Sequence, residues 1–254
     1  MTLTLLYQDE HLVAIDKPPG LLVHRTQLAA REGEAALQLL RDQLGRPVWP
    51  VHRLDRGTSG VLLFALSAEV ASLLGAMFEQ GRMDKRYLAR VRGWPSADAG
   101  LIDHPLARDP ELPSAGQPLL AAQTRWRVLQ REEWPVSTDP RFATTRVALL
   151  AAEPLQGRRH QIRRHLKHIA HPILGDATHG KGPLNRAVAA HLGLNRLWLH
   201  AEHLALTHPV SGAALTLQSP AWGPAPVAAA AVPPASAPGC APAPPAHPAA
   251  GWPR

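Results

Sequence analysis

A carboxylate stands among arginines, directly before small residues, in the stretch His52-Arg53-Leu54-Asp55-Arg56-Gly57-Thr58-Ser59-Gly60. In an extended chain alternate side chains share a face, so Arg53 and Asp55 should project together. Arg53 and Arg56 should keep the Asp55 carboxylate ionised, because nearby positive charge favours the charged form. An ionised, anchored carboxylate is a competent nucleophile or base. Taken alone, the pattern is more typical of a surface Arg–Asp pair before a turn.

A second charged segment, nearer the C-terminus, is Gly157-Arg158-Arg159-His160-Gln161-Ile162-Arg163-Arg164-His165-Leu166. Backbone amides and arginines after Gly157, at the start of an expected helix, are typical of a phosphate site. Arg159, Arg163 and Lys167 are spaced by four, which predicts one basic stripe that could follow an RNA backbone. A basic run alone is more often a solvated face, so both interpretations stay open.

The pattern of apolar residues and turn residues around these segments predicts one α+β domain with many short strands over residues 1–222. The expected helices are 34–44, 68–80 and 159–169. The expected strands are 3–7, 11–15, 61–66, 87–91, 124–130, 145–152, 197–200 and 204–207. Residues 105–118, rich in proline and charge, should form a loop.

The composition changes abruptly after about Trp222. The segment 223–254 is almost entirely alanine, proline and glycine. Proline opposes helix and sheet, and alanine offers too little side chain to build a core. We therefore expect a disordered tail there.

The overall charge points toward a polyanionic partner. The chain carries 27 Lys and Arg against 20 Asp and Glu, a net charge of +7, and its pI is about 10.4. The single cysteine, Cys240, excludes a disulfide within the chain and a cysteine-based zinc site. The N-terminus lacks the pattern of a signal peptide, and no apolar run approaches the length of a membrane span. These features predict a cytoplasmic protein without a membrane partner.

Taken together, the motifs resemble the RluA-type pseudouridine synthase family. Each motif alone would be weak evidence, but they occur in the family's order from about Leu5 to Ala221. The matching motifs are 52–55 with 58–60, Lys17-Pro18-Pro19-Gly20-Leu21, Lys85-Arg86-Tyr87 with Ala89-Arg90-Val91, Gly157-Arg158 with His160-Gln161-Ile162-Arg163, His171-Pro172-Ile173-Leu174-Gly175-Asp176, and Leu199-His200-Ala201. The resemblance implies a mixed, largely antiparallel sheet with flanking helices and a central basic cleft.

The resemblance also implies roles for individual residues. Asp55 would be the nucleophile, Arg163 would pair with it, and Tyr87 would stack on a uracil flipped out of the RNA. Arg53 would fill the space that the base leaves. The other expected substrate-binding residues are Arg56, Thr58, Arg158, His160 and Gln161. No metal or organic cofactor is implied, and the enzyme should act as a monomer without an obligatory protein partner.

One position departs from the family pattern. Gln156 stands where the family usually has threonine before Gly-Arg, a change that we expect the site to tolerate. The chain also has no room for the small N-terminal RNA-binding domain of many relatives. Recognition of the RNA should then come from the catalytic domain itself.

Finer features favour the branch of the family that modifies uridine 65 of tRNA. They include Thr144-Thr145-Arg146, His179-Gly180 and Asn185-Arg186. The alternative within the family is an enzyme acting on ribosomal RNA. A non-catalytic RNA-binding protein is disfavoured, since binding alone has no use for Asp55, Tyr87 and Arg163 together. A DNA-binding protein lacks a supporting motif.

Histidines spaced by three raise the alternative of a metal site. His165, His168 and His171 form one such group, and His200 and His203 form another. Neighbouring Arg163, Arg164 and Lys167 disfavour a bound cation, and the resemblance gives these histidines no metal role. We therefore expect no metal.

Overall fold

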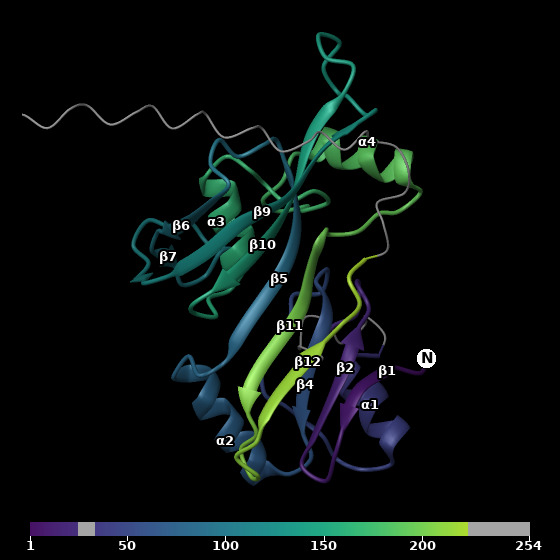
Figure 1. Cartoon of the computed structure of the whole chain (residues 1–254), viewed down its shortest axis with the longest axis vertical. Helices are drawn as coiled ribbons and strands as arrows, with labels where there is room; N and C mark the ends of the chain where they lie inside the picture. Colours follow the sequence, from purple (N-terminus) through teal and green to yellow (C-terminus); the bar gives the residue numbers. More distant parts are fainter. Residues whose placement is uncertain (25–33, 223–254) are drawn as a thin grey trace, which may run out of the picture.

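Ten strands form one sheet in the computed structural model, which describes residues 1–24 and 34–222 (Figure 1). Four helices pack around this sheet. The helices are α1 (Ala36–Leu44), α2 (Ala68–Glu79), α3 (Gln161–His168) and α4 (Gly182–Leu192). The strands are β1 (Thr4–Gln8), β2 (Leu12–Lys17), β3 (Trp49–Pro50), β4 (Ser59–Ala65), β5 (Asp84–Arg92), β6 (Ala99–Asp103), β7 (Leu106–Ala107), β8 (Leu119–Leu120), β9 (Gln123–Trp134), β10 (Thr145–Pro154), β11 (Leu199–Thr207) and β12 (Ala214–Gln218).

The main sheet has the order β1-β2-β4-β11-β5-β10-β9-β6, with β12 paired to β11 and β3 paired to β4. Strands β7 and β8 form a separate pair. Within the described residues only β4 and β11 pair in parallel, where His200 lies opposite Ser59 and Ala201 lies opposite Gly60. The α+β class and the largely antiparallel sheet are therefore confirmed.

Gly60 is the residue at which this parallel pairing becomes very close. Its φ is +108°, and an added Cβ would lie 2.2 Å from the carbonyl oxygen of Ala201. Only glycine fits such a position without moving a strand. Gly60, the last residue of the segment 52–60, is therefore required by the close packing of β4 against β11.

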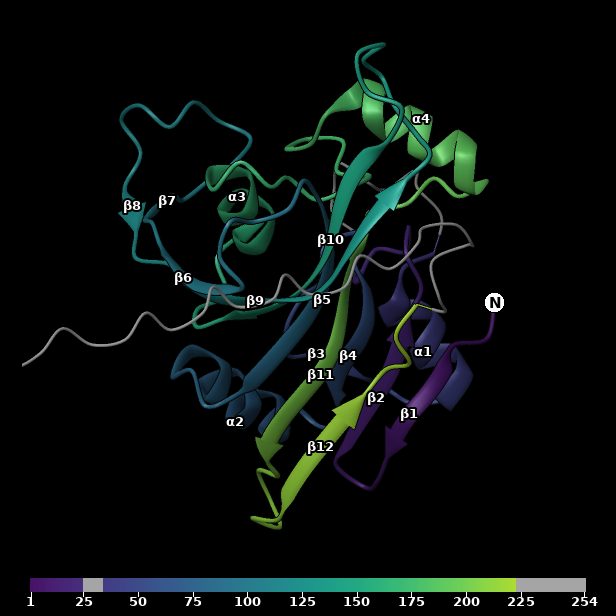
Figure 2. The same ribbon diagram turned by 45° about the horizontal axis from the view of Figure 1, so that its top comes forward.

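The N-terminal part of the sheet is buried on both faces. Val13 and Ile15 of β2 face a cluster that includes Leu40 of α1. Leu12 and Ala14, which alternate with them, face a second cluster that includes α2. The two helices consequently lie on either side of β2 and β4, as Figure 2 shows. A third cluster joins β5 and β10 to α3 and α4.

Most expected elements are present with shifted ends. The expected helix at 159–169 begins at Gln161, because His160 has left-handed backbone angles. The expected loop at 105–118 contains the two residues of β7. Strands β3, β6, β8 and β12 and helix α4 were not predicted, and the two strands expected at 197–200 and 204–207 form one strand, β11. Helix α4 begins with Gly182-Pro183, and proline suits the first turn of a helix.

The structure does not test the expected C-terminal tail. The predicted tail at 223–254 lies outside the described residues, as do residues 25–33. In the described parts of the chain, no helix is both long enough and apolar enough to cross a membrane.

Candidate active site

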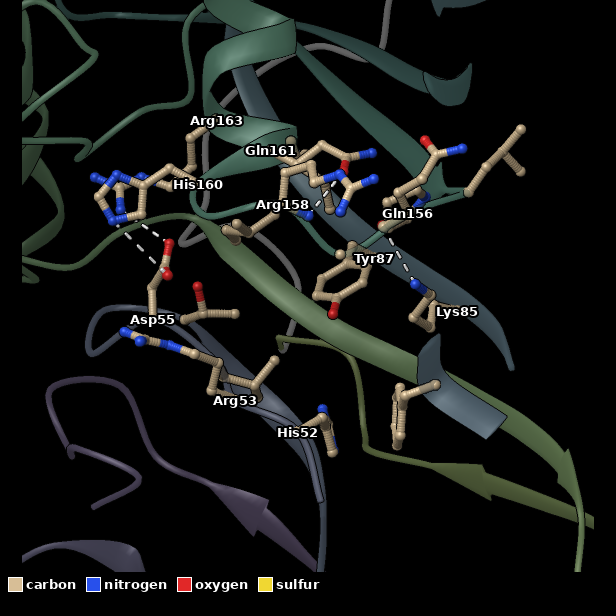
Figure 3. Close-up of a pocket in the computed structure, with 18 of the residues that line it drawn as sticks. His52, Arg53, Asp55, Lys85, Tyr87, Gln156, Arg158, His160, Gln161 and Arg163 are labelled. Atoms are coloured by element: carbon tan, nitrogen blue, oxygen red, sulfur yellow. Dashed lines mark hydrogen bonds and ion pairs between the residues drawn. The ribbon is translucent and has the colours of Figure 1, made fainter. Parts of the chain in front are cut away.

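A cavity of about 400 Å³ opens where the loop before β4 meets β5, β11 and the start of α3 (Figure 3). Its charged lining consists of Arg53, Asp55, Glu79, Lys85, Arg158 and Arg163. The cavity also brings together Thr58, Tyr87, His160 and Gln161, which the sequence singled out. The expected site residues therefore meet in one place, with the exception of Arg56.

Asp55 lies in the loop before β4, with its side chain 19% exposed. The turn is closed by the backbone N–H of Thr58, which donates to the Asp55 carbonyl at 3.0 Å. The carboxylate oxygen Oδ2 accepts a hydrogen bond from Arg163 Nη1 at 2.9 Å. The other oxygen, Oδ1, faces His160 Nε2 at 3.8 Å, which is too long for a hydrogen bond. One oxygen is thus anchored and the other is not.

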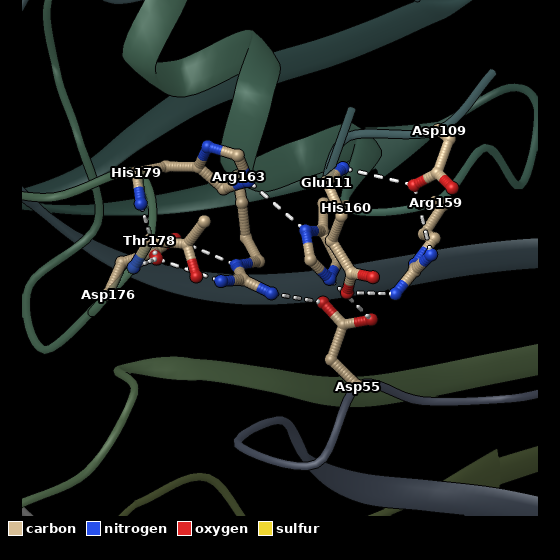
Figure 4. A network of polar contacts seen from close by, with 9 residues as sticks. All are labelled: Asp55, Asp109, Glu111, Arg159, His160, Arg163, Asp176, Thr178 and His179. Carbon is tan, nitrogen blue, oxygen red and sulfur yellow. Dashed lines mark hydrogen bonds and ion pairs between the residues drawn. The ribbon is translucent and has the colours of Figure 1, made fainter. Parts of the chain in front are cut away.

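Arg163 lies between two carboxylates (Figure 4). Besides Asp55, it contacts the fully buried Asp176 through Nε at 2.7 Å and Nη2 at 2.8 Å. Burial opposes the charge of the guanidinium, but the hydrogen bonds to Asp176 and Asp55 raise the pKa of Arg163 above its usual value. Arg163 is therefore a fixed positive charge at the back of the cavity.

Tyr87 projects into the same cavity from β5 (Figure 3). Burial, and then the neighbouring charge of Asp55, raise the pKa of its hydroxyl above the usual value. The phenol is therefore neutral near pH 7, so it can donate a hydrogen bond or stack on a ring, but it is a weak acid and a poor base.

Residues 11–168 match the protein family described as RNA pseudouridylate synthase. The chain belongs to this family. It is 45% identical over 222 residues to tRNA pseudouridine synthase C of Vibrio cholerae, covering 85% of this chain and 90% of that one. It is 47% identical to tRNA pseudouridine synthase C of Yersinia pestis, covering 85% of each. The solved structure of Human RNA Pseudouridylate Synthase Domain Containing 4 has a TM-score of 0.63 and 28% identity, over 86% of this chain and 88% of that chain.

The cation that balances Asp55 in this synthase is Arg163, the residue that the family resemblance pairs with it. The neighbouring residues Arg53 and Arg56, which the local pattern alone suggested, do not take this place. Arg56 is absent from the cavity lining, and its Nε donates to the Gly20 carbonyl at 3.1 Å. Helix α3 packs across the cavity and brings Arg163 directly onto Asp55.

The basic stripe on α3 is likewise not a single surface in the synthase. Arg163 is buried and points into the cavity, away from the exposed Lys167. Arg159 pairs with Asp109 and Glu111, in the segment between β7 and β8. Arg159, Arg163 and Lys167 therefore do not form the single exposed basic stripe that their spacing predicted.

Gln161, which lines the cavity, also has a structural role. Its Oε1 accepts from the Arg158 backbone at 3.0 Å, and its Nε2 donates to the Gln123 carbonyl at 2.9 Å. Gln156 is also tied to β9, since its Oε1 accepts from the Gln123 backbone at 2.6 Å. Both amide side chains fix the turn that leads into α3.

Lys17 holds the loop of Asp55 from below. The side chain is fully buried, and its Nζ donates to the carbonyls of Pro18 at 2.9 Å, Leu21 at 2.8 Å and Arg56 at 3.2 Å. Burial lowers the pKa of Lys17 to about 7, although Asp55 opposes this shift. The motif at 17–21 is thereby tied to the loop that carries Asp55.

Asp176 and His179 were quoted as parts of motifs but were assigned no function. Both belong to the polar network around Asp55 (Figure 4). The only available signal was their place in the resembling segments, since an acidic residue before a turn is common. The alternative of a metal site gains no support, because the described residues contain no group of three metal-binding side chains. His165 instead contacts Thr124 at 2.8 Å and the His104 carbonyl at 3.0 Å.

Proposed function

We propose that this synthase isomerises a uridine of tRNA to pseudouridine, with Asp55 as the nucleophile that attacks the target nucleotide. The isomerisation moves the ribose bond from N1 to C5 of the same uracil, so it neither gains nor loses atoms. The enzyme acts as a cytoplasmic monomer and requires no metal, organic cofactor or protein partner.

The observation that carries this proposal is the half-anchored carboxylate. Arg163 holds Oδ2 of Asp55 at 2.9 Å and leaves Oδ1 toward the cavity. A carboxylate that is charged, oriented and unshielded on one oxygen is suited to nucleophilic attack. A binding protein would gain nothing from a negative charge at the floor of a site that receives phosphates.

The cavity fits a single nucleotide that has left its stack. Its volume, about 400 Å³, lies in the range of small-ligand sites. A base inside a duplex cannot present its glycosidic bond to Asp55, so the target must be flipped. Tyr87 would stack on the flipped base inside the cavity. Arg53 is exposed on the loop that carries Asp55, and it would enter the space that the base vacates.

The choice of tRNA is supported by the relatives and by charge. The similar proteins of Vibrio cholerae and Yersinia pestis are named tRNA pseudouridine synthase C and match over most of their length. Arg158 and Lys85 on the cavity lining offer positive charge to the phosphates that flank the target. We expect uridine 65, near the junction of the acceptor and T stems, to be the target.

The test offers the purified full chain a tRNA transcript and ribosomal RNA transcripts side by side and locates pseudouridine in each. We expect one modified position, in the tRNA only. Modification of ribosomal RNA alone would overturn the tRNA substrate and favour the alternative within the family. Modification of no RNA by the chain would overturn the proposed activity.

A further inference from the structure

Two histidines lie in series against Asp55 (Figure 4). Nδ1 of His160 is 3.1 Å from Nε2 of His179, and the opposite nitrogen of His160 faces Asp55 Oδ1 at 3.8 Å. We infer that His160 orients the attacking oxygen of Asp55 and that His179 is a positioning residue that acts through His160. This inference rests on the proposed role of Asp55 as nucleophile.

The backbone of His160 supports a functional reason for its orientation. His160 is the N-cap of α3, yet it has φ 56° and ψ 25° and makes no capping hydrogen bond through its side chain. Left-handed backbone is unfavourable for a non-glycine residue, and strained residues cluster at active sites. The strain directs the imidazole into the cavity, where its side chain is 13% exposed, instead of leaving it at the helix end.

Electrostatics decide which nitrogen of His160 carries the proton. The contact between the two rings needs one proton, which lies either on His160 Nδ1 or on His179 Nε2. In the first case His160 would turn a nitrogen lone pair toward the Asp55 carboxylate, which is repulsive. In the second case His160 presents an N–H to that carboxylate. The second arrangement is therefore favoured. His179 sets it because its Nε2–H donates a hydrogen bond to Nδ1 of His160.

The surroundings keep both imidazoles neutral, as this arrangement requires. Burial lowers the pKa of His160 below its usual value and that of His179 to about 4. Among the charged neighbours, Asp55 and Asp176 oppose the shift of His160, whereas Arg163 and Arg159 reinforce it. The series therefore works as two neutral rings and adds no charge beside the nucleophile.

A single buried carboxylate holds both contacts to Asp55. Asp176 binds the Arg163 guanidinium, and its Oδ1 also accepts the backbone N–H groups of Thr178 at 2.9 Å and His179 at 2.8 Å. Arg163 then fixes Oδ2 of Asp55, while His160, which His179 contacts, faces Oδ1 at 3.8 Å. The two oxygens consequently meet different groups, and the contact at Oδ1 is loose enough to leave that oxygen available for attack.

Two substitutions at His179 test this inference. His179→Leu removes the proton donor, and His179→Gln keeps an N–H near the position of Nε2 as the matched control. We expect His179→Leu to slow the single-turnover rate by about tenfold, the effect of one ordinary hydrogen bond. RNA affinity and melting temperature should stay unchanged, and His179→Gln should keep most of the rate. Equal rates in His179→Leu and the unaltered chain would overturn the inference.

A double-mutant cycle separates this role from general packing. His160→Asn tolerates the left-handed backbone and keeps a polar atom near the position of Nδ1, but it is too short to reach Asp55. In that background His179→Leu should cause no further loss of rate, because its effect passes through His160. Losses that simply multiply would mean that His179 acts independently, and would overturn the inference.

A spectroscopic measurement tests the pairing without catalysis. In the full chain labelled with 15N-histidine, His160 should appear as the neutral ring protonated on Nε2, and His179→Leu should abolish this preference. Protonation of His160 on Nδ1 would overturn the inference even in a fully active enzyme. Failure of the unaltered chain to modify any RNA would instead count against the proposed function and would leave this assignment standing.

Discussion

Asp176 and Arg163 are joined by two parallel hydrogen bonds, Nε to Oδ2 at 2.7 Å and Nη2 to Oδ1 at 2.8 Å. This fork leaves Nη1 of Arg163 to reach Asp55. Although burial opposes the charge of Asp176, hydrogen bonds from Arg163 lower the pKa of its carboxyl below the usual value. The geometry of the nucleophile is thus set by a carboxylate that does not line the cavity.

Asp176→Asn should therefore damage both stability and activity. It keeps the shape but removes the charge that balances Arg163, whose side chain is only 9% exposed. Loss of one partner of a buried ion pair costs about 3–5 kcal/mol. Urea unfolding should show this loss, while Asp98→Asn, which breaks an exposed pair with Arg131, should leave stability nearly unchanged. Equal effects of the two variants would contradict the buried role of Asp176.

Arg163→Lys should lower turnover by about 100-fold or more while RNA binding changes little. Lysine keeps the positive charge but cannot contact Asp176 through two nitrogens and Asp55 through a third. Turnover and the dissociation constant should be measured on the same tRNA. A near-normal rate would show that charge alone is needed at this position.

Asp55→Asn should abolish pseudouridine formation and leave RNA binding largely intact. The amide preserves size but is not a nucleophile, whereas binding depends on many phosphate contacts. Binding and product should be assayed in parallel, with Arg53→Ala as a variant of the same loop that keeps the carboxylate. Substantial product from the Asn variant would remove Asp55 from the mechanism.

His52 should make the fold sensitive to acid. Burial, and then the charge of Lys85, lower the pKa of His52 from 6.5 to about 3, and its Nε2 accepts the Leu63 N–H at 3.0 Å. Between these pH values the unfolded chain binds a proton that the folded protein does not, so this stability is present above about pH 6.5 and is lost as the pH falls toward 3.

His52→Gln keeps an acceptor without the basic group, so its free energy of unfolding should fall less steeply with acid. Denaturant unfolding between about pH 7 and pH 4 measures this slope. His191→Gln, an exposed change on α4, serves as the control and should leave the slope unaltered. An unchanged slope in His52→Gln would refute the prediction.

Gly60→Ala should unfold or strongly destabilise the protein. The new Cβ would lie 2.2 Å from the Ala201 carbonyl oxygen at a φ of +108°. We expect a loss of about 3 kcal/mol or more. Gly75→Ala on α2 meets open space, so it should raise stability by up to about 1 kcal/mol. Thermal melting of both variants distinguishes the two, and a stable Gly60→Ala protein would mean that β4 and β11 can separate.

Local patterns were sufficient for the strands and helices with strong periodicity. The helix around Leu74 was predicted from apolar residues at helical spacing, and the strand around Leu63 from a continuous apolar run. Helix α4 and strand β12 were missed because their apolar residues are small or few. The motif resemblance also assigned Asp55, Tyr87 and Arg163 to one site from the sequence alone, since the order of motifs identifies the family.

By itself, the sequence determined the family, the α+β class and which residue types carry the chemistry, because these depend on residues close along the chain. The resemblance also implied the pairing of Asp55 with Arg163, which lie 108 positions apart in the sequence. Only the tertiary structure decided the other partners, such as the contact of Arg163 with Asp176 and that of His160 with His179. Such contacts follow from the parallel pairing of β4 with β11 and from helix packing, which align distant segments and leave no local pattern in the residues.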